Sequence, residues 1–209
     1  MTGAAVQQDD PDITLITETA PIATNTHGGR AKCLQRLVRL NLPVPRTVAL
    51  SFRSVHDIAE GRMPNLAQLL EPFGAHPLLC VRPSSEDPDW GGPSAVLNLG
   101  INDTVHAALS AKLGEEAATR LYNRFVRTYA VHVERLDPDM FSDLPDHGPD
   151  ALAQSLRAYR EETEEDFPQD PRVQITAVLK SMARAWRGTT ARLLRQAKGA
   201  PADAGLGLV

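Results

Sequence analysis

Two glycines and an arginine, Gly28, Gly29 and Arg30, stand where a segment with helical spacing of apolar residues begins. Glycines at such a start let backbone N–H groups approach a phosphate, whose negative charge the helix dipole favours. Arg30 adds a charged fork that is suited to phosphate oxygens. A Gly-Gly turn that enters an ordinary basic surface helix has the same sequence, and taken alone the motif favours that structural interpretation.

A second candidate is Arg82, which follows the apolar run Leu-Leu-Cys-Val at 78–81. That run is typical of a buried strand, and a loop rich in Pro, Ser, Asp and Gly follows it at 84–94. An arginine at the end of a strand beside a flexible loop is well placed for a ligand. An arginine that only ends the strand and pairs with Glu86 or Asp87 explains the pattern equally well.

Other residue types that often carry chemistry are scattered. The acidic residues of the 84–94 loop lack the spacing of a calcium loop, so no metal site is predicted. The six histidines show no ligand spacing, and no Ser or Cys stands in a nucleophile motif. Cys33 and Cys80 lie far apart in apolar runs and are predicted to be buried, reduced thiols of a cytoplasmic protein.

The composition bounds the class of protein. A chain of 209 residues with 42% hydrophobic residues is long and apolar enough to bury a core. A net charge of -4 argues against nucleic-acid binding, which needs a basic surface. No apolar run has the length of a membrane span, and the polar, acidic segment 1–12 does not resemble a signal peptide. We therefore expect a cytoplasmic protein with neither a nucleic-acid nor a membrane partner.

The first half of the chain alternates predicted strands with short helices. Strands are expected at 13–19, 47–51, 78–81 and 96–101, and helices at 28–41, 54–60 and 66–70. In the strand at 96–101, side chains at Leu97, Leu99 and Ile101 are expected on one face and Asn98 on the other.

Almost everything after Asp103 is predicted to be helical. Asp103 is expected to cap a helix that ends near Gly114, and Asp170 to cap another that begins at Pro171. A spacing of four at Leu121, Phe125 and Tyr129 indicates a longer helix, and Gly148 with Pro149 is expected to open another. The helix that begins at Pro171 should bury a stripe of Val178, Met182 and Trp186, and a break at Gly188 should precede a short helix to Lys198. The chain should divide into a flexible arm at 1–12, an α/β lobe at 13–103, a mainly helical subdomain at 104–198 and a tail or first strand segment at 199–209.

The last quarter of the chain is locally basic. Lys180, Arg184 and Arg187 share one face of a predicted helix, which could form an anion or nucleic-acid surface. The alternative is a solvated face that the acidic stretch at 161–166 balances. The negative net charge favours this alternative.

The order of the motifs is more informative than any one of them. It resembles the opening of pyruvate phosphate dikinases and phosphoenolpyruvate synthases from about Gly28 to Val209. The family has a Gly-Gly-Lys helix, a Leu-Pro-Val-Pro turn, a Val-Arg-Ser segment, a Leu-Asn-Leu-Gly-Leu-Asn-Asp segment, a Tyr-Arg-Arg-Phe helix and a Phe-Pro-Gln-Glu-Pro start. The matching residues here are Gly28 to Ala31, Leu42 to Pro45, Leu79 to Arg82, Val96 to Asp103, Tyr122 with Arg124 and Phe125, and Phe167 to Pro171.

The resemblance implies an α+β fold that is part of an ATP-grasp nucleotide-binding domain. In that family the domain phosphorylates a histidine on a separate swivelling domain, and the phosphoryl group passes on to pyruvate. By position, Arg30 stands at a phosphate-binding lysine and Arg82 at an arginine on the ATP phosphates. Gly91, with Gly92 beside it, stands in the loop that closes over the nucleotide. ATP is the implied cofactor, with Mg²⁺ in the complete enzyme.

Two departures from the family pattern stand out. Arg30 replaces the lysine, and the family's lid loop Met-Pro-Gly-Met-Met-Asp-Thr becomes Asp-Trp-Gly-Gly-Pro-Ser-Ala at 89–95. The family's metal-binding acids and phosphohistidine lie beyond the part that this chain resembles. The implied partners are therefore ATP, the remaining ATP-grasp lobe and a phosphohistidine domain, from a longer parent or a second protein, with self-association through an apolar seam as a further possibility. The alternatives are a non-catalytic paralogue with a protein-binding or regulatory role, and a helical anion-binding module on Lys180, Arg184 and Arg187.

Overall fold

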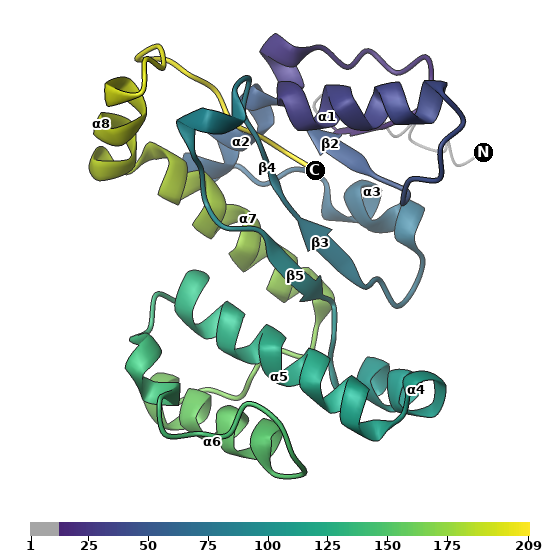
Figure 1. Ribbon diagram of the computed structural model, residues 1–209, viewed down its shortest axis with the longest axis vertical. Helices are drawn as coiled ribbons and strands as arrows, with labels where there is room; N and C mark the ends of the chain where they lie inside the picture. Colours follow the sequence, from purple (N-terminus) through teal and green to yellow (C-terminus); the bar gives the residue numbers. More distant parts are fainter. Residues whose placement is uncertain (1–12) are drawn as a thin grey trace, which may run out of the picture.

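The protein is described by a computed structural model that covers residues 13–209 (Figure 1), and the arm expected at 1–12 lies outside these residues. Within the described residues, one sheet contains β1 (Ile13–Leu15), β2 (Val48–Leu50), β6 (Gly207–Leu208) and β4 (Pro83–Ser84), in that order. All neighbouring strands are antiparallel, and Leu208 pairs with Leu50 on one side and with Pro83 on the other. The C-terminal strand therefore lies in the middle of the sheet.

A second pair of antiparallel strands, β3 (Leu79–Val81) and β5 (Val96–Leu99), extends this architecture. Arg82 joins β3 to β4, and its backbone exchanges hydrogen bonds of 2.7 and 3.0 Å with Val209. The segment from β3 to β4 thus runs without a break from one sheet into the other. Arg82 is positioned at the point where they meet.

The alternation expected in β5 is wrong. Val96 and Leu99 are buried, whereas Leu97 is exposed. The cause is a bulge: Leu99 pairs with Leu79 but Val96 pairs with Val81, so β5 carries one extra residue, and Asn98 has a φ of 61°. An extra residue shifts the side chains that follow to the other face.

Three helices cover the first half of the chain: α1 (Thr24–Arg39), α2 (Phe52–Ala59) and α3 (Leu66–Leu70), with 3-10 turns at Glu71–Phe73 and Pro88–Trp90. Helix α1 begins before the predicted start and is kinked at Gly28. It contacts β4 and β6, while α2 contacts α7 and β6. Helix α2 begins two residues before the predicted Ser54, because Ser51 Oγ accepts a hydrogen bond from Ser54 N and caps the helix.

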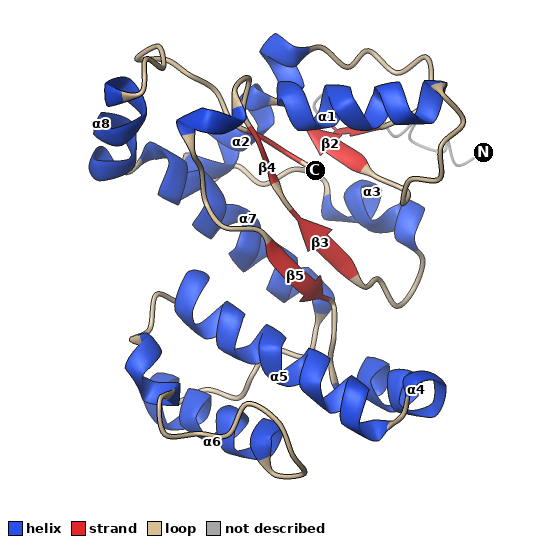
Figure 2. Cartoon of the chain, in the orientation of Figure 1, coloured by secondary structure: helices blue, strands red, loops and turns tan. Residues whose placement is uncertain are grey.

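The second half is helical, as predicted (Figure 2). Its helices are α4 (Asp103–Leu113), α5 (Glu115–His132), α6 (Ala151–Thr163), α7 (Pro171–Arg187) and α8 (Thr189–Ala197), with a 3-10 turn at Pro138–Phe141. Helices α4, α5 and α6 gather at one end of the molecule, and α7 runs from them back to the strands (Figure 1). None of the helices within residues 13–209 combines the length and apolar character that a membrane crossing requires.

The predicted helix caps are largely confirmed. Asp170 caps α7 by accepting the Arg172 N–H at 2.8 Å, and the stripe of Val178, Met182 and Trp186 on that helix is buried. At α4 the prediction was one residue off, since Asn102 Oδ1 accepts the Val105 N–H at 2.9 Å. A hydrophobic core extends from β2 and α2 through α7 into α5 and α6.

The two most specific motifs of the sequence meet in space. Gln169 Oε1 accepts the backbone N–H of Asp103 at 2.9 Å, and Gln169 Nε2 donates to the Tyr122 hydroxyl at 2.9 Å. Burial raises the pKa of Tyr122 to about 12, so its phenol stays protonated and donates to Asp103 at 3.2 Å. Phe167 forms edge-to-face ring contacts with four surrounding aromatic residues, Tyr122, Phe125, Tyr129 and Tyr159. These motifs join the helical end to the strands.

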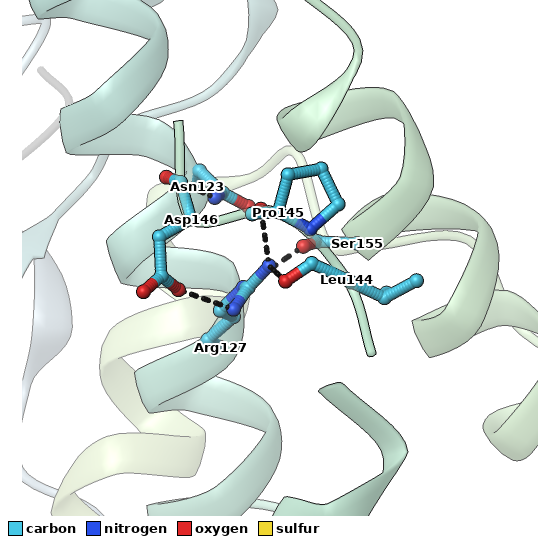
Figure 3. A network of polar contacts seen from close by, with 6 residues as sticks. All are labelled: Asn123, Arg127, Leu144, Pro145, Asp146 and Ser155. Carbon is cyan, nitrogen blue, oxygen red and sulfur yellow. Dashed lines mark hydrogen bonds and ion pairs between the residues drawn. The ribbon is translucent and has the colours of Figure 1, made fainter. Parts of the chain in front are cut away.

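An arginine on α5 holds the loop between α5 and α6 (Figure 3). Arg127 donates from Nε to Ser155 Oγ at 3.0 Å, from Nη1 to Asp146 Oδ1 at 2.6 Å, and from Nη2 to the carbonyls of Leu144 and Pro145 at 3.3 and 2.6 Å. The Asp146 side chain is 84% exposed, so the ion pair itself contributes little. The hydrogen bonds to Ser155 and the loop carbonyls are the larger contribution.

We expect Arg127→Met to lower the free energy of unfolding by about 2–3 kcal/mol, because the acceptors that it bonds lose their donor. The free energy of unfolding of Arg127→Lys should lie between those of the wild type and Arg127→Met, because an ammonium keeps the charge but cannot reproduce the planar fork. Arg124→Met, at an exposed position of the same helix, is the matched control and should change little. Urea denaturation measures all three. Equal loss in the two Met variants would contradict the interpretation.

Candidate functional site

The Gly-Gly motif forms a close packing contact between α1 and β4 with the residue that follows it, Ser85. Gly28 has a φ of 85°, and a Cβ at this position would lie 1.9 Å from the Ser84 carbonyl oxygen. The Gly29 N–H donates to the Ser85 carbonyl oxygen at 2.7 Å. The chain itself therefore uses this amide, and close approach of two backbones explains why a glycine stands at 28.

The side chain of Ser84 completes this contact. Its hydroxyl donates to the His27 carbonyl at 2.7 Å and accepts the Ala31 N–H at 3.1 Å. Ser84 is 1% exposed, so these bonds are made away from water. They fix the start of α1 against β4, and hence fix Arg30 relative to Arg82.

Arg30 and Arg82 are brought close together by this contact. Arg30 Nε donates to the Pro83 carbonyl at 2.9 Å, one residue beyond Arg82. Burial lowers the pKa of Arg30, and the neighbouring charge of Arg82 lowers it further, whereas the thiols of Cys80 and Cys33 act in the opposite direction. Neither arginine forms an ion pair with a carboxylate among residues 13–209, so the pairing of Arg82 with Glu86 or Asp87 is not observed.

Arg82 also stands at the rim of a groove of about 540 Å³, and Arg46, Thr47 and Asn98 are further polar residues of its lining. The groove is mostly apolar, and its walls come from α1, α3, α7 and strands β2, β3, β5 and β6. They include Leu34, Leu69, Phe73, Leu78, Leu79, Leu97, Ile175, Leu179 and Leu208. An apolar groove that is open to solvent therefore lies beside Arg82, the neighbour of Arg30.

The prediction that both cysteines are buried is wrong, since Cys33 and Cys80 are exposed. The buried face of α1 carries Ala31 and Gln35, so Cys33 falls outside it. In β3, Val81 packs inward and Cys80 lines the groove. Partial desolvation raises the pKa of the Cys80 thiol, against the opposing effect of Arg82 and Arg30.

The predicted lid glycines lie beside the same strand. Gly91 ends the 3-10 turn Pro88–Trp90 with a φ of 81°, and Gly92 packs where a side chain would contact Pro83 and Trp186. A side chain at Gly91 would come within 3.9 Å of Lys198 Nζ, a cation that the sequence did not connect with this loop. The structure therefore places Gly28, Gly29, Arg30 and Gly92 beside the β3–β4 segment that contains Arg82, with Gly91 adjacent to Gly92.

One residue of the basic helix face, Arg187, has an acidic partner, and it is not the one that was predicted. Arg187 forms an ion pair with Glu60, the residue that follows α2, while the acidic stretch at 161–166 supplies Asp166 to Arg160. Lys180 and Arg184 form no ion pair among the described residues. The partner of Arg187 is distant in sequence, which is why local charge patterning did not identify it.

Known proteins with sequences similar to this chain suggest a role for this site. A pyruvate, phosphate dikinase of Rhizobium meliloti (strain 1021) is 27% identical over an alignment of 214 positions, which covers 85% of this chain and 24% of that protein. The chain is similar to pyruvate, phosphate dikinases. The chloroplastic pyruvate, phosphate dikinase 1 of Zea mays is 28% identical over 135 residues (56% of this chain, 14% of that protein), and the dikinase of Clostridium symbiosum is 28% identical over 147 residues (61% and 17%).

This similarity to dikinases has a limited extent. The chain spans about a quarter or less of the length of these curated relatives. No protein-family model matches the chain. The similarity indicates a dikinase-related protein, and the α+β fold of the described residues is consistent with it.

Proposed function

We propose that this chain is the ATP-binding portion of a dikinase-type phosphotransferase and that Arg30 and Arg82 bind the phosphates. The observation that carries the proposal is the placement of these two guanidinium groups, from α1 and from the β3–β4 junction, without a carboxylate partner in the described chain. Two adjacent cations repel each other, and a polyphosphate between them removes that repulsion.

The two arginines have different freedom in this proposal. Arg30 is partly held by its bond to the Pro83 carbonyl, while Arg82 is exposed at the rim of the groove. Arg30 would then supply a fixed charge, and Arg82 would move onto the incoming phosphates. The loop with Gly91 and Gly92 lies close enough to Pro83 to cover them.

Residues 13–209 do not fit the Mg²⁺ that the dikinase family uses. Within residues 13–209 no three or more His, Cys, Asp or Glu side chains group as metal ligands. The proposed site is lined by cations rather than by carboxylates. We therefore assign no step through the metal to this chain, and we propose that histidine phosphorylation requires a further lobe and a phosphohistidine domain, in the same or a partner protein.

The proposal is tested by titrating ATP into the folded chain by calorimetry, with and without Mg²⁺. We expect saturable binding that weakens by about tenfold or more in Arg82→Ala, equivalent to about 1.4 kcal/mol. Arg82→Lys should retain part of the affinity because it keeps the charge but loses the bidentate fork. Arg124→Ala removes an exposed arginine on α5 and should bind like the wild type. No ATP binding by the folded wild-type chain would refute the proposal.

A non-catalytic, protein-binding role is the alternative function. It is favoured by the apolar groove, where Leu78 and Leu97 are 43% and 39% exposed. In that case the folded chain should not bind ATP, and Leu97→Asp should weaken association with another protein or a second copy. Sedimentation of the wild type and the variant distinguishes self-association from a monomer.

A further inference from the structure

A second cavity, of about 480 Å³, lies between α2, α7, α8 and the segment that leads into β6. It is separate from the groove beside Arg82, since the two share no lining residue. Aromatic and apolar walls come from Phe52, Val55, Trp186 and Leu206. Its charged and titratable lining is mostly basic: Arg53, His56, Arg187, Arg192 and Arg195, against the single acid Asp203.

Arg195 is the unusual member of this lining. It is 7% exposed, and its guanidinium carbon lies over the Trp186 ring, 3.6 Å from the centroid. Among residues 13–209 the structure gives its side chain no hydrogen bond and no ion pair. Burial lowers the pKa of Arg195, and the charge of Arg192 lowers it further.

A buried cation without an anion is costly to keep. Contact with tryptophan offsets part of this cost, and the N–H donors of the guanidinium line the cavity without an acceptor from the described chain. A neighbouring cation, Arg192, increases the cost rather than reducing it. Buried charges in proteins are normally paired, so an anion in this cavity would complete the arrangement.

The charges nearby define what kind of anion fits. Two acids near the cavity already have partners: Glu60 pairs with Arg187, and Asp57 of α2 pairs with Arg62. Neither acid is therefore available to Arg195. Arg192 and Arg195 thus exceed Asp203 by one charge before His56 and Arg53 are considered. Two guanidinium groups together offer more N–H donors than one carboxylate or a chloride can accept, and a tetrahedral oxyanion with several acceptor oxygens uses more of them.

We propose that this cavity is a binding site for a phosphate group, either inorganic phosphate or the phosphate of a small monoester, held by Arg192 and Arg195. The volume exceeds that of a phosphate alone, and Phe52 and Trp186 provide apolar surface for an attached organic group. The site is independent of the proposed ATP site, because Arg30 and Arg82 do not line it.

The stacked pair provides a direct readout. The chain has two tryptophans, Trp90 and Trp186, so Trp90→Phe leaves Trp186 as the only tryptophan. Inorganic phosphate is titrated into this variant at constant ionic strength, with phenyl phosphate in a parallel arm and potassium chloride as the control salt. We expect a saturable change in Trp186 fluorescence with phosphate and none with chloride. Tighter binding of phenyl phosphate would identify the monoester as the better ligand.

Variants assign this change to the cavity. Arg192→Gln removes an exposed cation and should keep the fold while it weakens phosphate binding by about tenfold. Arg184→Gln makes the same change on α7 outside the lining and should bind normally, as should Arg82→Ala. No saturable response in the folded protein, or equal weakening by Arg192→Gln and Arg184→Gln, would overturn the proposal.

Discussion

A Gly28→Ala variant is expected to lose about 3–5 kcal/mol of its free energy of unfolding, a large share of the 5–15 kcal/mol typical of a domain. The added Cβ would lie 1.9 Å from the Ser84 carbonyl oxygen and 2.3 Å from its carbon. Both atoms belong to backbone that is paired with β6, so the clash cannot be relieved by rotating a side chain. Urea denaturation followed by far-UV circular dichroism measures the loss.

Gly61→Ala is the matched control for this variant. Gly61 has nearly the same φ, 89° against 85°, but a Cβ there would meet nothing within 4 Å. Its cost is therefore limited to the backbone strain of a left-handed conformation, about 1–2 kcal/mol. Equal losses in the two variants would show that backbone strain, and not contact with Ser84, explains the glycine at 28.

The Gly28 contact also bears on the proposed ATP site. Arg30 is two residues from Gly28, and Arg82 two residues from Ser84, so displacing one backbone from the other separates the guanidinium groups. At a temperature where Gly28→Ala remains folded, we expect it to bind ATP more weakly than the wild type, as Arg82→Ala does. Gly61→Ala should bind ATP like the wild type.

A Gln174→Met variant is expected to lose about 3–5 kcal/mol, because it leaves three backbone groups without their partner. Gln174 is fully buried; its Oε1 accepts the Gly100 N–H at 2.8 Å, and its Nε2 donates to the carbonyls of Ile101 and Pro168 at 3.0 and 2.7 Å. Methionine has a similar length but offers none of these hydrogen bonds. Thermal or urea unfolding measures the effect.

Gln196→Met, at an exposed position of α8, is the control and should change stability by less than about 0.5 kcal/mol. Hydrogen exchange adds a local readout, since the Gly100 amide should lose its protection in Gln174→Met before the rest of the core does. A variant that keeps wild-type stability would contradict the assignment of Gln174 as the link between the strands and the helical end.

Local signals in the sequence were enough to locate most helices. Asp170 and Pro171 start α7, Gly114 ends α4, and Gly188 separates α7 from α8, as predicted. Each of these signals acts through groups within a few residues along the chain, such as the Arg172 N–H that Asp170 accepts. Such interactions are encoded in the local sequence, which is why they could be predicted.

The sequence also showed the motifs that resemble dikinases, but it did not show what these motifs do in the structure. The segment at 98–103 contains the bulge residue Asn98, the turn residue Gly100 and the cap residue Asn102. A Cβ at Gly100 would lie 1.8 Å from the Pro77 carbonyl oxygen. Only the tertiary structure shows that these residues, with Gln169 and Gln174, join the strands to the helices.

The sequence by itself determined the α+β class and the location of most helices, and it supplied the candidate residues of the site. Tertiary structure decided which faces are buried, so Cys33 and Cys80 are exposed although both lie in apolar runs. It also decided which charges meet: Arg187 pairs with Glu60, and Arg195 stacks on Trp186 across the break at Gly188. The physical reason is that burial and charge pairing depend on elements distant along the chain, which local spacing does not encode.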